Sequence, residues 1–127
     1  MTRFRKQPNE SGAVAVEFAL LLPFLLLIVV GLIEFGRGYN AKISLTHAAR
    51  EGARALAVGK PIADVQSTIV NAADGIDTSK LSISGLTACS PGSTATITLN
   101  YPLSYSIPFW TNGSWDIDAK GTMRCGG

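Results

Sequence analysis

The sequence is poor in the residues that catalytic and metal sites require. It has a single histidine, His47, and two cysteines, Cys89 and Cys125, which lack the Cys-x-x-Cys spacing of a metal site or redox motif. It also has no nucleophile motif and no pair of carboxylates at a spacing that would suit acid–base catalysis. We therefore expect no enzyme activity, no catalytic residue, no metal, no cofactor and no small-molecule substrate.

Charge is also sparse and evenly spread. The formal net charge of +2 is small, and lysines and arginines do not gather into a patch, so nucleic acid is not an expected partner. The chain has no internal repeat and no low-complexity tract. Its length leaves room for one small domain and a membrane segment.

Apolar residues are concentrated in one long run. A basic leader ends at Gly12, and the chain then stays apolar over residues 13–33, which is long enough to span a bilayer as a helix. A cleaved secretory signal would be shorter and would end in a small-residue site, so we expect this run to be retained. Glu17 is the one charge inside it, and such charges are usually functional.

The cysteines indicate the orientation of the chain. Two distant cysteines in a small extracytoplasmic domain form a structural disulfide more often than they act as reactive thiols. We therefore predict a Cys89–Cys125 disulfide and a cytoplasmic N-terminus. The predicted division is a leader over residues 1–12, a transmembrane helix over 13–36 and an extracytoplasmic domain over 37–127.

The domain is predicted to be α+β, with helices over residues 37–74 and a sheet over residues 80–126. Beyond the membrane the first helix carries a stripe of mostly small residues, and Gly36 and Gly38 are expected to weaken the junction. This helix should end near Gly59, and Pro61 should open a second helix. The small-residue stripe consists of Leu45, Ala49, Gly52, Ala53 and Leu56.

Apolar and polar residues then alternate, which predicts three antiparallel strands over residues 81–84, 94–101 and 115–125. The stripe of the first helix and one face of the second helix are the available covers for this sheet. Residues 102–115 are expected to form the second connection. The aromatic rings there either close the small core or form an exposed patch, with Phe109 and Trp110, for a partner or lipid headgroups.

Three motifs in order resemble the TadE-like family, the minor pseudopilins of the tight-adherence (Flp pilus) system. The first begins at Gly12 and includes Glu17 and Phe18, the second is Glu34-Phe35-Gly36-Arg37, and the third covers residues 48–54. Thr122-Met123-Arg124-Cys125 also resembles the end of family members. The match is specific in the first half of the chain and rests mainly on layout in the second.

The resemblance implies insertion into the bacterial inner membrane and cleavage by a prepilin peptidase between Gly12 and Ala13. It also implies a role in assembling a Flp-type pilus for surface attachment, with other pseudopilins or pilins and the inner-membrane platform of the pilus as partners. Glu17 and Phe18 would then act in assembly, with Glu17 pairing with the new amine of Ala13 on its own chain or a neighbour.

Alternative interpretations exist for several of these residues. Gly12 and Glu17 could belong to an unprocessed single-pass anchor that carries an extracytoplasmic binding or adhesion module. For Glu34 and Arg37, we prefer a surface pair that marks the membrane interface. His47 is expected on a solvated helix face.

Overall fold

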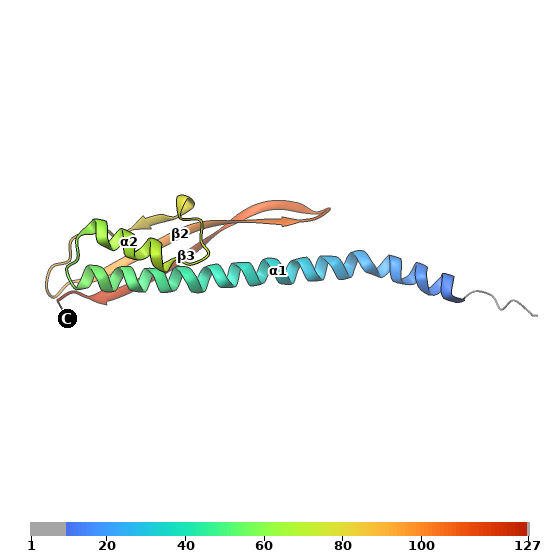
Figure 1. The fold of residues 1–127 in the computed structure, drawn as a ribbon, viewed down its shortest axis with the longest axis horizontal. Coiled ribbons are helices and arrows are strands. Elements are labelled where there is room, and N and C mark those ends of the chain that lie inside the picture. The colour runs from blue at the N-terminus through green and yellow to red at the C-terminus, as the bar shows by residue number, and fades with distance from the viewer. Residues whose placement is uncertain (1–9, 127) are drawn as a thin grey trace, which may run out of the picture.

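A computed structural model describes residues 10–126 of the chain; most of the predicted leader, residues 1–9, lies outside this part. The elements are the helices α1 (Glu10–Ala57) and α2 (Ile62–Ala72), the 3-10 helix η1 (Thr78–Lys80), and the strands β1 (Ser82–Ser84), β2 (Thr94–Ile107) and β3 (Thr111–Arg124). The strands form one antiparallel sheet in the order β1-β2-β3. The predicted α+β fold is confirmed (Figure 1).

Helix α1 is one continuous element of 48 residues. It contains a segment long and apolar enough to cross a membrane, and this segment is not buried by the rest of the chain. The helix continues through Gly36 and Gly38, so the weak junction expected there does not interrupt it. In Figure 1 the N-terminal end of α1 extends beyond the domain, its C-terminal half lies against α2 and the sheet, and the β2–β3 hairpin reaches past the middle of the helix.

The C-terminal half of α1 packs closely because its inner face is made of small residues. A Cβ at Gly52 would lie 2.5 Å from Ile69 Cγ1 of α2, and a Cβ at Gly121 of β3 would overlap the backbone carbonyl of Ala49. Both glycines therefore allow contacts that a side chain would block. The buried residues of α1 are Ala41, Leu45, Ala48, Ala49, Gly52, Ala53, Ala55, Leu56 and Ala57.

Helix α1 ends as the sequence predicts. The N–H of Gly59 donates to Leu56 O at 3.1 Å and that of Lys60 donates to Ala55 O at 3.1 Å, while Gly59 has a φ of 84°. This pair of bonds is the Schellman arrangement, which favours glycine at the left-handed position. Pro61 then occupies the N-cap position of α2, directly before its first turn.

The β2–β3 hairpin is longer than predicted. β2 continues through Pro102 to Ile107, and β3 already starts at Thr111, so the prediction of a connection over residues 102–115 is wrong. The turn is only Pro108-Phe109-Trp110. β1 pairs with β2 only as far as Asn100, so the edge of β2 that faces away from β3 is open at Pro102. A proline is tolerated there because no neighbouring strand needs its N–H.

Candidate functional site

The predicted cleavage point lies in the N-terminal part of α1. Gly12 and Ala13 are exposed, and among residues 10–126 no side chain or distant backbone atom would lie within 4 Å of a Cβ at Gly12. The Gly12–Ala13 peptide bond is therefore not covered by another described part of the chain.

Glu17 and Phe18 follow one turn later, and both side chains are exposed on the apolar helix. Glu17 is four residues after Ala13, so the two lie on the same helix face as neighbours. Within residues 10–126, no ion pair involves Glu17. An amine created at Ala13 by cleavage would thus lie within reach of this carboxylate.

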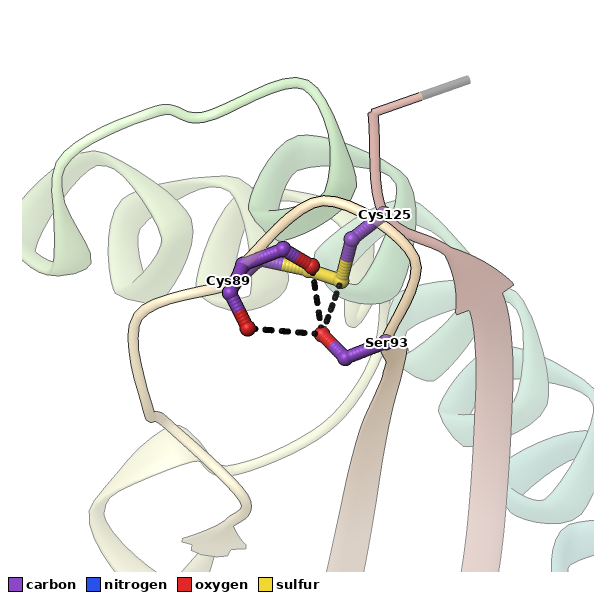
Figure 2. The surroundings of a disulfide bond; sticks show 4 residues. Cys89, Ser93 and Cys125 are labelled. Carbon is purple, nitrogen blue, oxygen red and sulfur yellow. Dashed lines mark hydrogen bonds between the residues drawn. A yellow bond between two sulfur atoms is a disulfide. The ribbon is translucent and has the colours of Figure 1, made fainter.

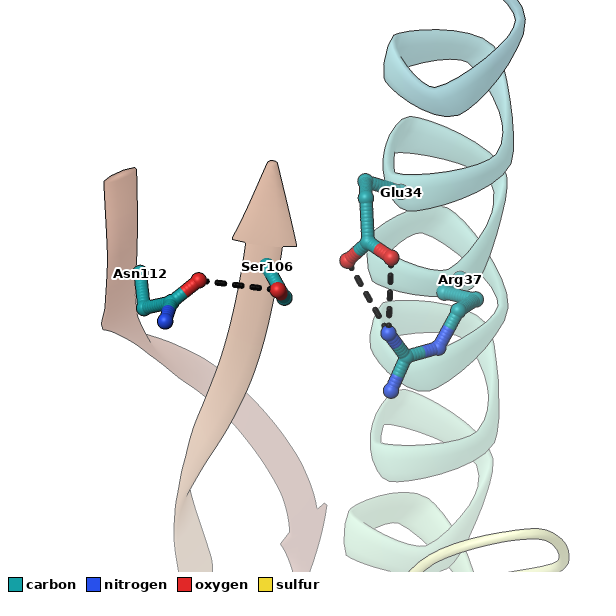
Figure 3. A network of polar contacts seen from close by, with 4 residues as sticks. All are labelled: Glu34, Arg37, Ser106 and Asn112. Atoms are coloured by element: carbon teal, nitrogen blue, oxygen red, sulfur yellow. Dashed lines mark hydrogen bonds and ion pairs between the residues drawn. The ribbon is translucent and has the colours of Figure 1, made fainter. Parts of the chain in front are cut away.

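A polar cluster marks the other end of the apolar run. Arg37 Nη1 donates to Glu34 Oε2 at 2.9 Å and to Oε1 at 3.0 Å, and the side chain of Glu34 is only 15% exposed. Beside this pair, Ser106 Oγ of β2 donates to Asn112 Oδ1 of β3 at 2.8 Å (Figure 3). The expected Glu34–Arg37 helix pair is present, and the hairpin brings a second polar pair to the same region.

The aromatic residues of the hairpin separate into two groups. The Tyr105 and Trp115 rings pack together with centroids 5.4 Å apart, and Trp115 also contacts α1, because a Cβ at Gly38 would lie 3.1 Å from Trp115 Cζ2. Phe109 and Trp110 at the turn are instead exposed, Trp110 by 78%. Of the two alternatives, the exposed patch therefore holds for Phe109 and Trp110, and closure of the core does not.

The hairpin tip and the apolar half of α1 enclose a groove of about 600 Å³. No charged residue lines it. The lining residues are Ala19, Leu22, Pro23, Leu26, Leu27 and Val30 of α1 and Pro108, Phe109 and Trp110 of the turn. We refer to this space as the tip groove. The tip groove forms only because β2 extends to Ile107, which the sequence pattern did not predict. The continued alternation of Leu103, Tyr105 and Ile107 is the signal that could have indicated the extension.

Cys89 and Cys125 lie at disulfide distance, with Cα atoms 5.8 Å apart, which fits the predicted bridge (Figure 2). Pro91 and Gly92, with φ of 87° at Gly92, form the turn before β2, and Ser93 Oγ donates to Cys125 Sγ at 3.3 Å. The N–H of Gly126 donates to Ala57 O at 3.2 Å. The C-terminus is thus fixed to the end of α1.

Other polar residues of the domain take part in local structure or face solvent. Residues 10–126 contain no group of three potential metal ligands, and His47 lies on an exposed face of α1 as predicted. Hydrogen bonds from the Ser79 hydroxyl and backbone N–H lower the pKa of Asp77, which caps η1. That carboxylate therefore orders the segment after α2.

Comparison with known proteins identifies a family for the N-terminal part of the chain. Residues 12–54 match the family model described as TadE-like protein, which confirms the resemblance inferred from the N-terminal motifs. The matched segment starts at Gly12 and includes the apolar run, the Glu34–Arg37 pair and the small-residue half of α1. No curated protein and no solved structure was found to match the chain.

Proposed function

From the TadE-like segment at residues 12–54, we propose that the chain is a membrane-anchored, non-enzymatic minor pseudopilin of a Flp-type (tight-adherence) pilus. In this proposal a prepilin peptidase cleaves between Gly12 and Ala13, the N-terminus faces the cytoplasm and the domain lies outside the inner membrane. The mature subunit then assists pilus assembly for surface attachment, together with other pilins or pseudopilins and the inner-membrane platform.

The observation that carries the proposal is the arrangement of residues 12–17 on α1. A glycine without neighbours precedes an exposed apolar helix, and a single carboxylate follows one turn after the bond to be cut. A residue without a side chain suits the acyl side of a bond cut by an intramembrane protease. After cleavage, the new amine of Ala13 would lie four residues before Glu17 on the same helix face and could form an ion pair with it.

The same arrangement supports a function of Glu17 in assembly. A carboxylate within an apolar run is unfavourable in lipid unless it is paired or reaches the interface. In the mature subunit its partner is the amine of Ala13, in the same chain or in a neighbour. Pairing between chains would favour transfer of the helix from lipid into contact with other subunits.

Co-expression with a prepilin peptidase of the tight-adherence type tests the proposal. The wild-type chain should lose residues 1–12, whereas Gly12→Leu should insert normally and remain uncut, because the spanning run is unchanged. Gly31→Leu is the matched control: Gly31 is also a helical glycine without neighbours within 4 Å, and its substitution should leave cleavage intact. Efficient cleavage of Gly12→Leu at the same bond would contradict the proposal.

A further inference from the structure

The hairpin tip lies beside the part of α1 that is assigned to the membrane. At 1.5 Å per residue, residues 13–33 extend about 31 Å, which matches the hydrocarbon thickness of a bilayer. Pro108, Phe109 and Trp110 line the tip groove together with residues of α1 from Ala19 to Val30. At the same rise per residue, Leu26 lies roughly 10 Å along the helix axis from Ile33, the end of the apolar run nearest the domain. The tip groove therefore reaches that far into the membrane-spanning segment.

The face of α1 that packs on the domain continues down to this level. Along this face the covered residues recur at spacings of three or four. They run from the buried Leu45 and Ala41, through Gly38 and Glu34, to the half-buried Val30 and Leu27. The tip lies opposite the end of this face, with the tip groove between them.

The composition of the hairpin changes at the expected membrane boundary. The Ser106–Asn112 hydrogen bond lies near the Glu34–Arg37 pair (Figure 3), so the polar side chains of both elements are paired there. Beyond it the chain carries Ile107, Pro108, Phe109 and Trp110, and the one polar side chain, Thr111, donates to Asn112 O. Aromatic residues at this position correspond to the aromatic belt of membrane proteins.

Two of the three N–H positions in the turn are accounted for. Pro108 has no N–H, the N–H of Trp110 donates to Ile107 O at 3.2 Å, and Ile107 pairs with Thr111 as the last pair of the hairpin. Unpaired backbone groups are what exclude most irregular segments from lipid. This turn therefore suits a partly apolar environment.

Phe109 adds a separate indication. Its φ is 64°, in the left-handed region that glycine and asparagine adopt at lower cost, yet its ring touches little of the chain. A bulky residue held in that conformation and fully exposed gains nothing from packing within its own domain. Contacts with an apolar environment outside the chain would offset this cost.

We propose that the β2–β3 hairpin tip inserts into the membrane leaflet on the side of the domain, and that phospholipid acyl chains fill the tip groove between Trp110 and α1. The charge-free lining, the depth beside α1 and the exposed aromatic rings all fit this occupant. The inference rests on the membrane anchor of the proposed function and not on cleavage at Gly12. It gives the domain a second attachment to the bilayer, which fixes its height and tilt.

Tryptophan fluorescence of the full chain in phospholipid vesicles tests this proposal. Trp115→Phe leaves Trp110 as the reporter at the tip, and Trp110→Phe leaves Trp115 as the matched reporter beside Gly38. Lipids brominated in the middle of the acyl chain should strongly quench Trp110 and quench Trp115 several-fold less. Acrylamide in the water should quench Trp110 weakly.

Each other outcome contradicts the inference. Quenching of Trp110 by acrylamide and not by brominated lipid would place the tip in water. Protection from both quenchers would place another protein chain, such as a second copy, in the tip groove, and dilution into excess lipid would identify self-association. If Trp115→Phe fails to fold, the difference between the wild type and Trp110→Phe isolates the Trp110 signal.

Discussion

Glycines at two positions set how closely the domain packs around α1. At Gly121 an added Cβ would overlap the Ala49 backbone, which is fixed within a helix, whereas at Gly52 it would meet the side chain of Ile69, and there alanine also favours the helix over glycine. The consequences of the two substitutions should therefore differ even though both glycines are buried.

Gly121→Ala is expected to destabilise the domain by about 1–3 kcal/mol, the usual range for overpacking, and Gly52→Ala by less. Gly36→Ala is the control, since Gly36 has no neighbour within 4 Å and alanine favours a helix. Thermal unfolding of the detergent-solubilised full chain measures the three variants. A Gly121→Ala variant as stable as the wild type would show that β3 does not lie this close to α1.

Glu17 carries the proposed assembly function. Glu17→Gln removes the charge and keeps the shape, so membrane insertion should be unchanged or improved, and cleavage should persist. Crosslinking to partner pseudopilins should fall.

Glu10→Gln serves as the control for Glu17→Gln. Glu10 is an exposed carboxylate at the same end of α1, and cleavage at Gly12 removes it from the mature chain. Equal crosslinking yields for the two variants would show that Glu17 does not pair with a partner.

The hairpin shows where prediction from the sequence succeeded and where it failed. Alternation correctly predicted β2 up to Tyr101 and β3 from Trp115, because each strand has one face on the core and one in solvent. The extension beyond Pro102 was missed because proline is normally excluded from a paired strand. Its position at an open edge depends on the length of β1, a tertiary property that a local pattern does not contain.

The turn of this hairpin also gives a prediction. Replacing Phe109 with glycine removes the strain of a left-handed bulky residue, about 1–2 kcal/mol, and adds the greater chain entropy of glycine, about 0.5–1 kcal/mol. The stability of the domain should therefore change by no more than about 1 kcal/mol.

Urea unfolding of Phe109→Gly and the wild type provides the measurement for the turn. A loss of several kcal/mol would mean that the Phe109 ring packs inside the domain, against its full exposure. Trp115→Gly is a useful comparison because that ring contacts Tyr105 and α1, and it should be clearly destabilising.

The disulfide joins the connection between β1 and β2 to the end of β3. The Cys89–Cys125 pair has a sequence separation of 36 and holds the C-terminus beside the end of α1. In the chain-entropy model a bridge of this size contributes about 3–4 kcal/mol. Cys89→Ser with Cys125→Ser should lower stability by that amount, and a reducing agent should do the same to the wild type.

A reducing agent should have no further effect on the double serine variant, which controls for its action elsewhere. Two free thiols in protein taken from its native membrane would contradict the bridge. They would also remove the argument for a domain in an oxidising compartment.

At the scale of the whole molecule, one helix serves two environments. The N-terminal half of α1 is exposed and apolar, and its C-terminal half is the centre of the domain's core. The sequence predicted this division because the change from large to small apolar residues along α1 is visible in the chain itself. It did not predict the tip groove, since that site needs the hairpin to run back along the helix.

The central claim is that this chain is a processed, membrane-anchored subunit with an oxidised domain. Intact mass measurement of the protein extracted from its native membrane, without reduction, tests it most directly. The account predicts one species that begins at Ala13 and lacks two hydrogen atoms because of the Cys89–Cys125 bond. A membrane species that begins at Met1 would contradict processing and support an uncleaved anchor instead.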